Sequence, residues 1–163
     1  MMRLPSEDTR VTLAAILEAQ PFVRALRPAD RALLAGCGSL VSYHAGEFVF
    51  HEGGFADAFY LIYHGSVALE VAVPAGPPVT LETLGAGEVL GWSWLFPPYR
   101  WVFDARAGAV TRLVKLDAAC VRGQAERNPS FGYALMQRVA QSMAARLQAA
   151  RLQLMDVYGE SRH

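Results

Sequence analysis

The sequence has almost no lysine and carries no net charge. Its 15 basic residues, of which Lys115 is the one lysine, balance 15 acidic residues. A surface that binds nucleic acid normally appears as an excess of basic side chains. The composition therefore predicts that this chain does not bind DNA directly.

Cysteine is scarce, and long apolar runs are missing. Cys37 and Cys120 lie far apart in the sequence and fit neither a disulfide framework nor the spacing of metal ligands. This pattern is typical of a reducing compartment, so we expect a cytoplasmic location. No apolar run approaches the roughly 20 residues of a membrane span, and the N-terminal segment MMRLPSEDTR is too polar for a secretory signal. We expect no membrane partner.

Closely paired histidines are missing as well. A metal centre of the cupin type needs such pairs, whereas His44, His51 and His64 stand seven and thirteen residues apart. No arrangement of a nucleophile with its base stands out in the sequence either. We therefore predict no metal site, no catalytic cofactor and no enzymatic activity.

The residues that are present predict one packed domain over residues 1–163. Hydrophobic residues make up 53% and charged residues 18% of the chain, which excludes disorder. Apolar residues at three- and four-residue spacing predict short N-terminal helices within residues 10–36, divided at Pro21 and Pro28. Gly36 and Gly38 end this helical pattern.

After Gly38 the apolar period changes to two, which is typical of strands. Short turns rich in glycine, proline and aspartate separate eight candidate strands within a region that we place at residues 39–116. The candidates are 40–43, 47–52, 58–63, 67–73, 79–84, 89–90, 101–105 and 110–116. The pattern predicts an α+β fold built on an antiparallel double-sheet β-roll of the jelly-roll kind.

Helical periodicity returns over residues 117–158. Asp117 is a suitable N-cap for a helix over residues 118–127, and Asn128-Pro129 begins a second, long helix. Gly159 is the expected stop of that long helix.

The long helix carries two apolar stripes. Phe131, Leu135 and Val139 form an early stripe, which we expect to dock on the roll. The second stripe repeats in steps of four and three, as in a coiled coil, and predicts a homodimer. Its members are Met136, Ala140, Met143, Leu147, Ala150, Leu154 and Val157.

One segment resembles a known family. Residues 46–67, GEFVFHEGGFADAFYLIYHGSV, place Gly-Glu before a strand, Glu-Gly after it, then Ala-Asp, Tyr-x-Ile and Gly-x-Val in order. This order is similar to the first half of cyclic nucleotide-binding domains, which occur in catabolite-activator-type regulators and in regulatory subunits of protein kinase A. The resemblance implies a regulatory domain that signals through its C-terminal helix. The helix-turn-helix that often follows in such regulators is not expected here, because the sequence ends at His163.

The family binds its ligand through a phosphate-binding cassette, and residues 91–101, GWSWLFPPYRW, take that place. Gly91 and Arg100 match the family's glycine and arginine. Trp92 stands where the family has glutamate, Trp94 replaces a small residue, and Trp101 follows the arginine. The resemblance implies a ligand site for cyclic AMP, cyclic GMP or another small anion. Its residues would be Gly91, Trp92, Ser93, Trp94, Leu95, Arg100 and Trp101.

Two functional hypotheses follow. In the first, the chain is a sensor that binds such an anion and repositions its C-terminal helix. In the second, the chain is a ligand-free dimeric scaffold whose tryptophans fill the former pocket. Because a buried arginine needs a negative partner, a ligand-free site predicts a carboxylate such as Asp104 beside Arg100.

Overall fold

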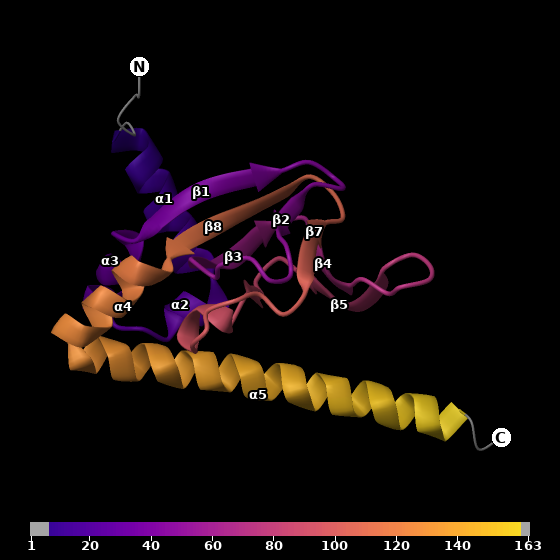
Figure 1. Ribbon diagram of the computed structural model, residues 1–163. Helices are drawn as coiled ribbons and strands as arrows, with labels where there is room; N and C mark the ends of the chain where they lie inside the picture. Colours follow the sequence, from indigo (N-terminus) through magenta and orange to yellow (C-terminus); the bar gives the residue numbers. More distant parts are fainter. Residues whose placement is uncertain (1–6, 161–163) are drawn as a thin grey trace.

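The computed structural model describes residues 7–160 and shows two four-stranded sheets with helices packed around them (Figure 1). Three short helices come first: α1 (Glu7–Ala19), α2 (Pro21–Arg24) and α3 (Pro28–Ala35). Proline occupies the first turn of both α2 and α3. Proline favours this position because its fixed φ suits a helix start and its missing N–H is not needed there. The predicted helices, divided at Pro21 and Pro28, are confirmed.

The two antiparallel sheets form the expected β-roll. The first sheet has the strand order β1-β8-β3-β6 and the second has the order β2-β7-β4-β5. The first sheet contains β1 (Gly38–Tyr43), β8 (Thr111–Asp117), β3 (Ala58–His64) and β6 (Val89–Leu90). The second contains β2 (Phe48–Phe50), β7 (Asp104–Ala107), β4 (Ser66–Val71) and β5 (Val79–Gly85). The predicted fold class is therefore confirmed.

One strand begins later than predicted. The sequence pattern places a strand over residues 101–105, whereas β7 begins at Asp104. Residues before it leave the sheet because Arg100 forms an isolated bridge with Phe55 of a distant loop. Local alternation carries no information about this competing partner.

Strand β3 is buried on both faces. Phe59 packs edge-on against Phe22 of α2, with ring centroids 6.3 Å apart, on the side where the helices lie. Its neighbour Tyr60 lies 6.3 Å from the ring of Phe50, inside the roll. Successive side chains of a strand point to opposite faces, so β3 separates the roll interior from the helical layer.

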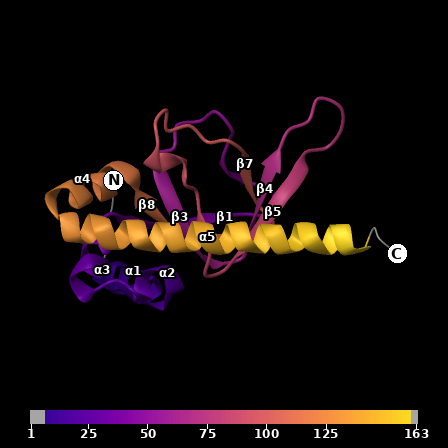
Figure 2. The ribbon, with the colours of Figure 1, turned by 90° about the horizontal axis from the view of Figure 1, so that it is seen from below.

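Two helices complete the chain. Helix α4 (Ala118–Arg127) begins at Asp117, whose carboxylate accepts the backbone N–H of Cys120 at 2.9 Å, as predicted. Helix α5 (Pro129–Glu160) crosses beneath the roll and extends past it (Figure 2). Its early stripe, Phe131, Leu135 and Val139, is buried as expected. The predicted stop at Gly159 is wrong, because glycine permits a helix end without imposing one.

The two cysteines form a disulfide, contrary to the sequence-based expectation. Antiparallel pairing of β1 with β8 places Gly38 opposite Leu116, and the N–H of Asp117 donates to the carbonyl of Cys37 at 3.0 Å. Cys120 lies one helical turn beyond Asp117, so its Cα comes within 5.6 Å of that of Cys37. The argument for a reducing compartment that rested on unpaired cysteines therefore no longer applies.

Within residues 7–160, no helix has both the length and the apolar character that crossing a membrane requires.

Candidate functional site

The predicted cassette begins where β6 ends. Gly91 follows Leu90 directly and adopts φ +97°, a backbone conformation that side chains with a Cβ rarely accept. The indole of Trp101 covers this glycine: a Cβ at Gly91 would lie 2.8 Å from Cζ3 and Cη2 of Trp101. Trp101 therefore fills the space directly in front of Gly91.

Backbone hydrogen bonds hold Trp101 in this place. The N–H of Gly53 donates to the carbonyl of Trp101 at 2.8 Å, and the N–H of Trp101 donates to the carbonyl of Gly54 at 2.9 Å. A third bond, from the N–H of Ala56 to the carbonyl of Tyr99, measures 2.7 Å. The loop between β2 and β3 is thus joined to the end of the cassette across the mouth of the roll.

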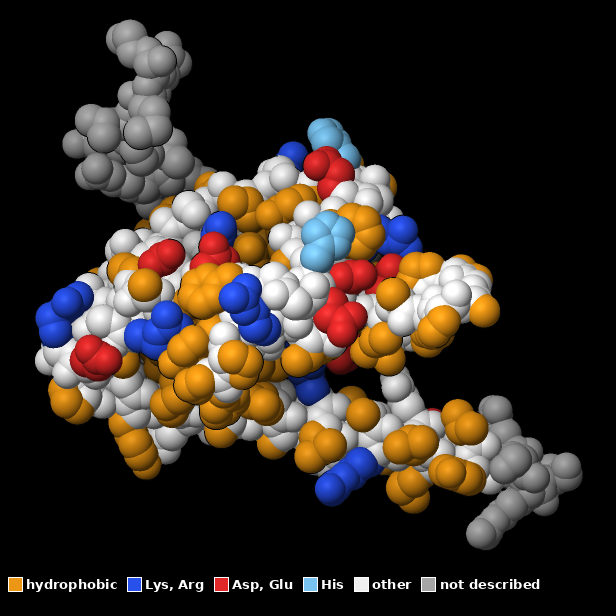
Figure 3. All heavy atoms as spheres, viewed as in Figure 1, with side chains coloured by type: hydrophobic (Ala, Val, Ile, Leu, Met, Phe, Trp, Pro, Cys, Tyr) orange, Lys and Arg blue, Asp and Glu red, His pale blue; other side chains and the backbone are white. Residues whose placement is uncertain are grey.

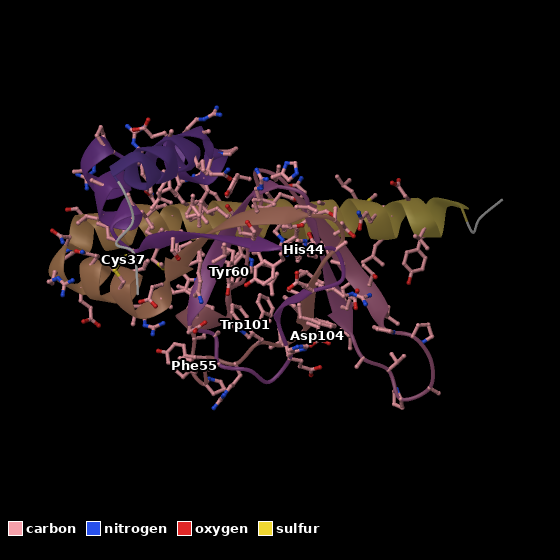
Figure 4. All side chains as sticks on the ribbon, turned by 90° about the horizontal axis from the view of Figure 1, so that it is seen from above. Cys37, His44, Phe55, Tyr60, Trp101 and Asp104 are labelled. Carbon is pink, nitrogen blue, oxygen red and sulfur yellow. A yellow bond between two sulfur atoms is a disulfide. The ribbon has the colours of Figure 1, made fainter. Side chains whose placement is uncertain are left out.

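Inside the roll, Trp101 is part of an aromatic cluster. Its ring stacks on Phe50 with centroids 3.7 Å apart and planes 8° apart, and Tyr60 and Phe103 flank Phe50. Trp101 is 4% exposed and Tyr60 3%. Figure 4 shows Tyr60 and Trp101 close together between the two sheets. Aromatic side chains from both sheets therefore occupy the interior next to the cassette.

The environment of the cluster is poor in water. Burial raises the pKa of the Tyr60 hydroxyl strongly, with smaller contributions from nearby Tyr43 and Asp57. Burial also raises the pKa of Tyr43, and the carboxylates of Glu47 and Asp57 add to that shift. An environment that disfavours the tyrosinate is equally unfavourable for an unpaired anion.

The three tryptophans point in different directions. Trp94, in the short 3₁₀ helix η1 (Ser93–Leu95), is 1% exposed and stacks on Phe59 with centroids 4.6 Å apart. Trp94 therefore lies on the helical side of β3, opposite Trp101, and its Nε1 has no hydrogen-bond partner. Trp92 is half-buried, with the guanidinium of Arg146 6.0 Å from its ring centroid. Of the predicted site residues, Trp101 alone stacks in the cluster around Phe50.

Arg100 points away from the roll. Its side chain is exposed, lies over the ring of Phe55 at 5.8 Å and approaches the carbonyl of Gly53 at 3.5 Å. Asp104 instead accepts the N–H of Glu52 at 2.7 Å and lies 3.7 Å from Nδ1 of His51. Asp104 therefore does not pair with Arg100, the arrangement that the sequence predicted for a ligand-free site. An exposed guanidinium is solvated by water and needs no buried carboxylate.

Two arginines that the sequence analysis missed hold the cassette from the helices. Arg122 of α4 donates to the carbonyl of Trp94 at 2.7 Å and lies 4.9 Å from the ring centroid of Tyr99. Arg146 of α5 pairs with Glu82 at 2.7 Å and donates to the carbonyl of Val89 at 3.3 Å. Arg146 follows Val139 by seven residues, so it continues the docking stripe of α5, and this spacing was the available signal.

A partly buried ion pair joins two strands of the second sheet. The guanidinium of Arg106 in β7 donates twice to Oε1 of Glu70 in β4, at 2.6 and 3.0 Å. The Glu70 side chain is 3% exposed, and its second oxygen has no partner. No sequence signal marks this pair, because it depends on the register between β4 and β7.

Among residues 7–160, no cluster of three or more histidine, cysteine or acidic side chains is arranged to hold a metal ion.

A family model for the cyclic nucleotide-binding domain matches residues 40–128, which is more than half of the chain. This chain belongs to the cyclic nucleotide-binding domain family. The matched region contains the roll, the whole cassette and helix α4. The resemblance found in residues 46–67 is thereby confirmed.

Individual relatives agree with this assignment. The chain is 39% identical over 102 residues to a cAMP-dependent protein kinase regulatory subunit of Emericella nidulans. That match covers 63% of this chain and 24% of the relative, so the chain spans about a quarter of that protein's length.

Solved structures of the family are similar over most of the chain. A Geobacter metallireducens protein assigned to cyclic nucleotide binding has a TM-score of 0.71 and 28% identity, with 89% of this chain and 99% of that chain covered. The catabolite activator protein of Thermus thermophilus has a TM-score of 0.66 and 27% identity, with coverage of 85% and 63%. These similarities identify a domain of a regulatory family.

Proposed function

We propose that this chain is a dimeric regulatory domain of the cyclic nucleotide-binding family whose own aromatic side chains replace the nucleotide. The observation that carries the proposal is the position of Trp101, directly over Gly91 and stacked on Phe50. A ligand in front of Gly91 would have to displace this buried indole and break its stacking. The domain then acts as a scaffold rather than as an enzyme.

The charge distribution supports the same proposal. A cyclic phosphate needs a cation inside the roll, since an unpaired buried anion costs several kcal/mol. Arg100, the arginine that matches the cassette, lies outside on Phe55. Arg106 is committed to Glu70. Neither arginine is placed to neutralise a phosphate next to Gly91.

The proposed partner is a second copy of this chain, bound along α5. A helix of 32 residues is about 48 Å long, and its buried docking stripe ends at Val139. Beyond that point the heptad stripe is open to solvent, with Met143 38%, Leu147 55% and Leu154 57% exposed. Figure 3 shows apolar side chains along this far half of α5, which extends away from the body. A coiled-coil stripe of this length is best buried against an identical helix.

In a second candidate function, the domain binds a ligand in the roll. The helices contact the cassette through Arg122, which bonds Trp94, and Arg146, which lies over Trp92. A cyclic nucleotide that expelled Trp101 would therefore also act on α4 and α5. In that case the chain would be the anion sensor that the family resemblance implies. The two candidates differ in whether a nucleotide stabilises the fold.

Thermal unfolding separates the two candidates. We expect the midpoint of the purified chain to stay within about 1 °C in millimolar cyclic AMP or cyclic GMP, because the roll is filled. A ligand at 100 times its dissociation constant would add about 2.7 kcal/mol, which corresponds to a rise of about 5–10 °C for a domain of this size. A rise of that size would overturn the ligand-free proposal.

Two arginine variants test whether a stabilisation by cyclic nucleotide arises at the cassette. Arg100→Ala removes the cassette arginine, and Arg112→Ala removes an exposed arginine of β8 as the matched control. A stabilisation lost in Arg100→Ala but kept in Arg112→Ala would establish the sensor. The same stabilisation in both variants would show an effect of the nucleotide outside the cassette.

A further inference from the structure

We infer that the Cys37–Cys120 disulfide is a redox-reactive site whose reduction releases the cassette through helix α4. The inference rests on the proposed function in one respect, which is that α5 forms the dimer contact. A regulatory domain whose pocket is filled by its own side chains has to take its signal elsewhere. The disulfide joins the first turn of α4 to Cys37, just before β1 (Figure 4).

Helix α4 connects the disulfide to the cassette over a very short distance. Cys120 lies in the first turn of this ten-residue helix, and Arg122 lies two residues further along. Arg122 donates to the carbonyl of Trp94 at 2.7 Å and covers the ring of Tyr99. Any shift or rotation of the first turn of α4 therefore acts on the cassette through one side chain.

The same helix connects the disulfide to α5. Gly132 of α5 packs so closely against α4 that an added Cβ would lie 3.2 Å from the Cβ of Ala125. A single residue, Asn128, joins the two helices in sequence. Packing this tight transmits a displacement of one helix to the other, because neither surface can deform freely.

The chemistry requires a dithiol reductant. One thiolate of the reductant attacks Sγ of Cys120, the disulfide bond breaks, and Cys37 leaves as a thiolate that takes up a proton. The second thiol of the reductant then displaces Cys120, so the reductant ends as a cyclic disulfide. The protein gains two electrons and two protons. Cys120 is the more accessible partner, being half-buried, whereas Cys37 is 7% exposed.

Reduction removes the covalent bond that ties the first turn of α4 to Cys37. Two thiols pack at van der Waals contact instead of being bonded, so the sulfur atoms have to separate. Cys37 is held by its N–H, which donates to the carbonyl of Leu34 at 2.9 Å, and by the bond from Asp117. Cys120 also donates its N–H to the Asp117 carboxylate at 2.9 Å, but its side chain is half-buried whereas that of Cys37 is buried. We therefore expect the Cys120 side to move, and Arg122 with it.

Hydrogen exchange with mass spectrometry tests the inference on the full chain, oxidised and after reduction with dithiothreitol. We expect amides of residues 92–99 to exchange at least about fivefold faster after reduction, while those of β4 and β7 stay unchanged. Arg122→Ala should give the fast rate already in the oxidised protein, with no further change on reduction. A Cys37→Ser/Cys120→Ser variant, which serves as the reagent control, should not respond to dithiothreitol.

Several results would overturn the inference. Faster exchange restricted to the residues around Cys37 and Cys120, or spread evenly over the chain, would make the disulfide purely structural. Slow exchange of the cassette amides in oxidised Arg122→Ala, or a further acceleration when that variant is reduced, would show that Arg122 is not the connection. Failure of the dimer proposal is recognised separately, because the cassette amides report on reduction whether or not α5 associates.

Discussion

The indole of Trp101 lies so close to Gly91 that a single added methyl group at Gly91 would be only 2.8 Å from two of its ring atoms. Gly91 also has φ +97°, so alanine at this position meets both backbone strain and a steric clash. The indole therefore fills the interior of the roll in front of Gly91.

Gly91→Ala should lower the free energy of unfolding by about 2–4 kcal/mol, from backbone strain of about 1–2 kcal/mol and a similar cost of overpacking. Trp101→Ala should cost about 3–5 kcal/mol through lost burial. In the double variant the clash is absent, so the losses should sum to about 1–2 kcal/mol less than the two single losses. Urea unfolding of the three variants measures this coupling. If the loss in the double variant equals the sum of the two single losses, the contact between Gly91 and Trp101 is contradicted.

Leu147→Glu should dissociate the proposed dimer. Leu147 belongs to the heptad stripe of α5, and a carboxylate there would be desolvated in the interface. Leu152→Glu is the matched control, since Leu152 is 57% exposed and Leu147 55%, but Leu152 lies outside the stripe. Light scattering coupled to gel filtration should show a monomer for Leu147→Glu and a dimer for Leu152→Glu. If both variants are dimers, the interface does not include Leu147 and lies outside the heptad stripe.

The ion pair between Arg146 and Glu82 should contribute modestly to the attachment of α5. Their side chains are 20% and 40% exposed, so water and salt screen the pair. A double-mutant cycle with Arg146→Ala and Glu82→Gln should give a coupling of about 0.5–1 kcal/mol that decreases in high salt. Arg146→Ala should cost more than Glu82→Gln, because it also loses the bond to the carbonyl of Val89. A coupling that high salt leaves unchanged would argue against a screened pair.

Alkaline pH should destabilise the fold through Tyr60. Its pKa in the folded state is raised above the ordinary value of 10.0, chiefly by burial. The folded protein therefore retains the Tyr60 proton after the unfolded chain has released it. The stabilising effect of burial is present in full below pH 10 and is lost as the pH rises toward the folded pKa.

Tyr60→Phe tests this assignment, since it removes the titrating hydroxyl and keeps the ring against Phe50. Urea midpoints measured from about pH 8 to about pH 11.5 should fall less for Tyr60→Phe than for the unaltered chain. Tyr43 also has a raised pKa, so Tyr43→Phe should reduce the alkaline loss as well. Identical pH profiles for the three proteins would show that other groups control alkaline unfolding.

Some parts of the site were accessible from local patterns. The position of Gly91 after a short strand, the N-cap Asp117 and the docking stripe of α5 all depend on residues close together in sequence. The signals that mark them are local: the end of a strand, a helix cap and the spacing of apolar residues along a helix. For that reason these predictions agree with the structure.

Other parts depend on how distant segments meet. The surroundings of Arg100 were not predictable, because its contacts with Phe55 and Gly53 come from a loop distant in sequence. The partners of Arg122 and Arg146 escaped prediction for the same reason, since both lie on elements outside their own helices.

What the sequence by itself determined is the identity and order of the elements: short helices, eight strands, a capped helix and a long helix with two apolar stripes. Hydrophobic periodicity and helix caps act locally, so the chain carries them wherever it folds. The tertiary structure alone decided that Cys37 and Cys120 are bonded and that Trp101 fills the roll. Sheet register and the contact between two loops bring these groups together, and both arise from long-range packing that no local pattern records.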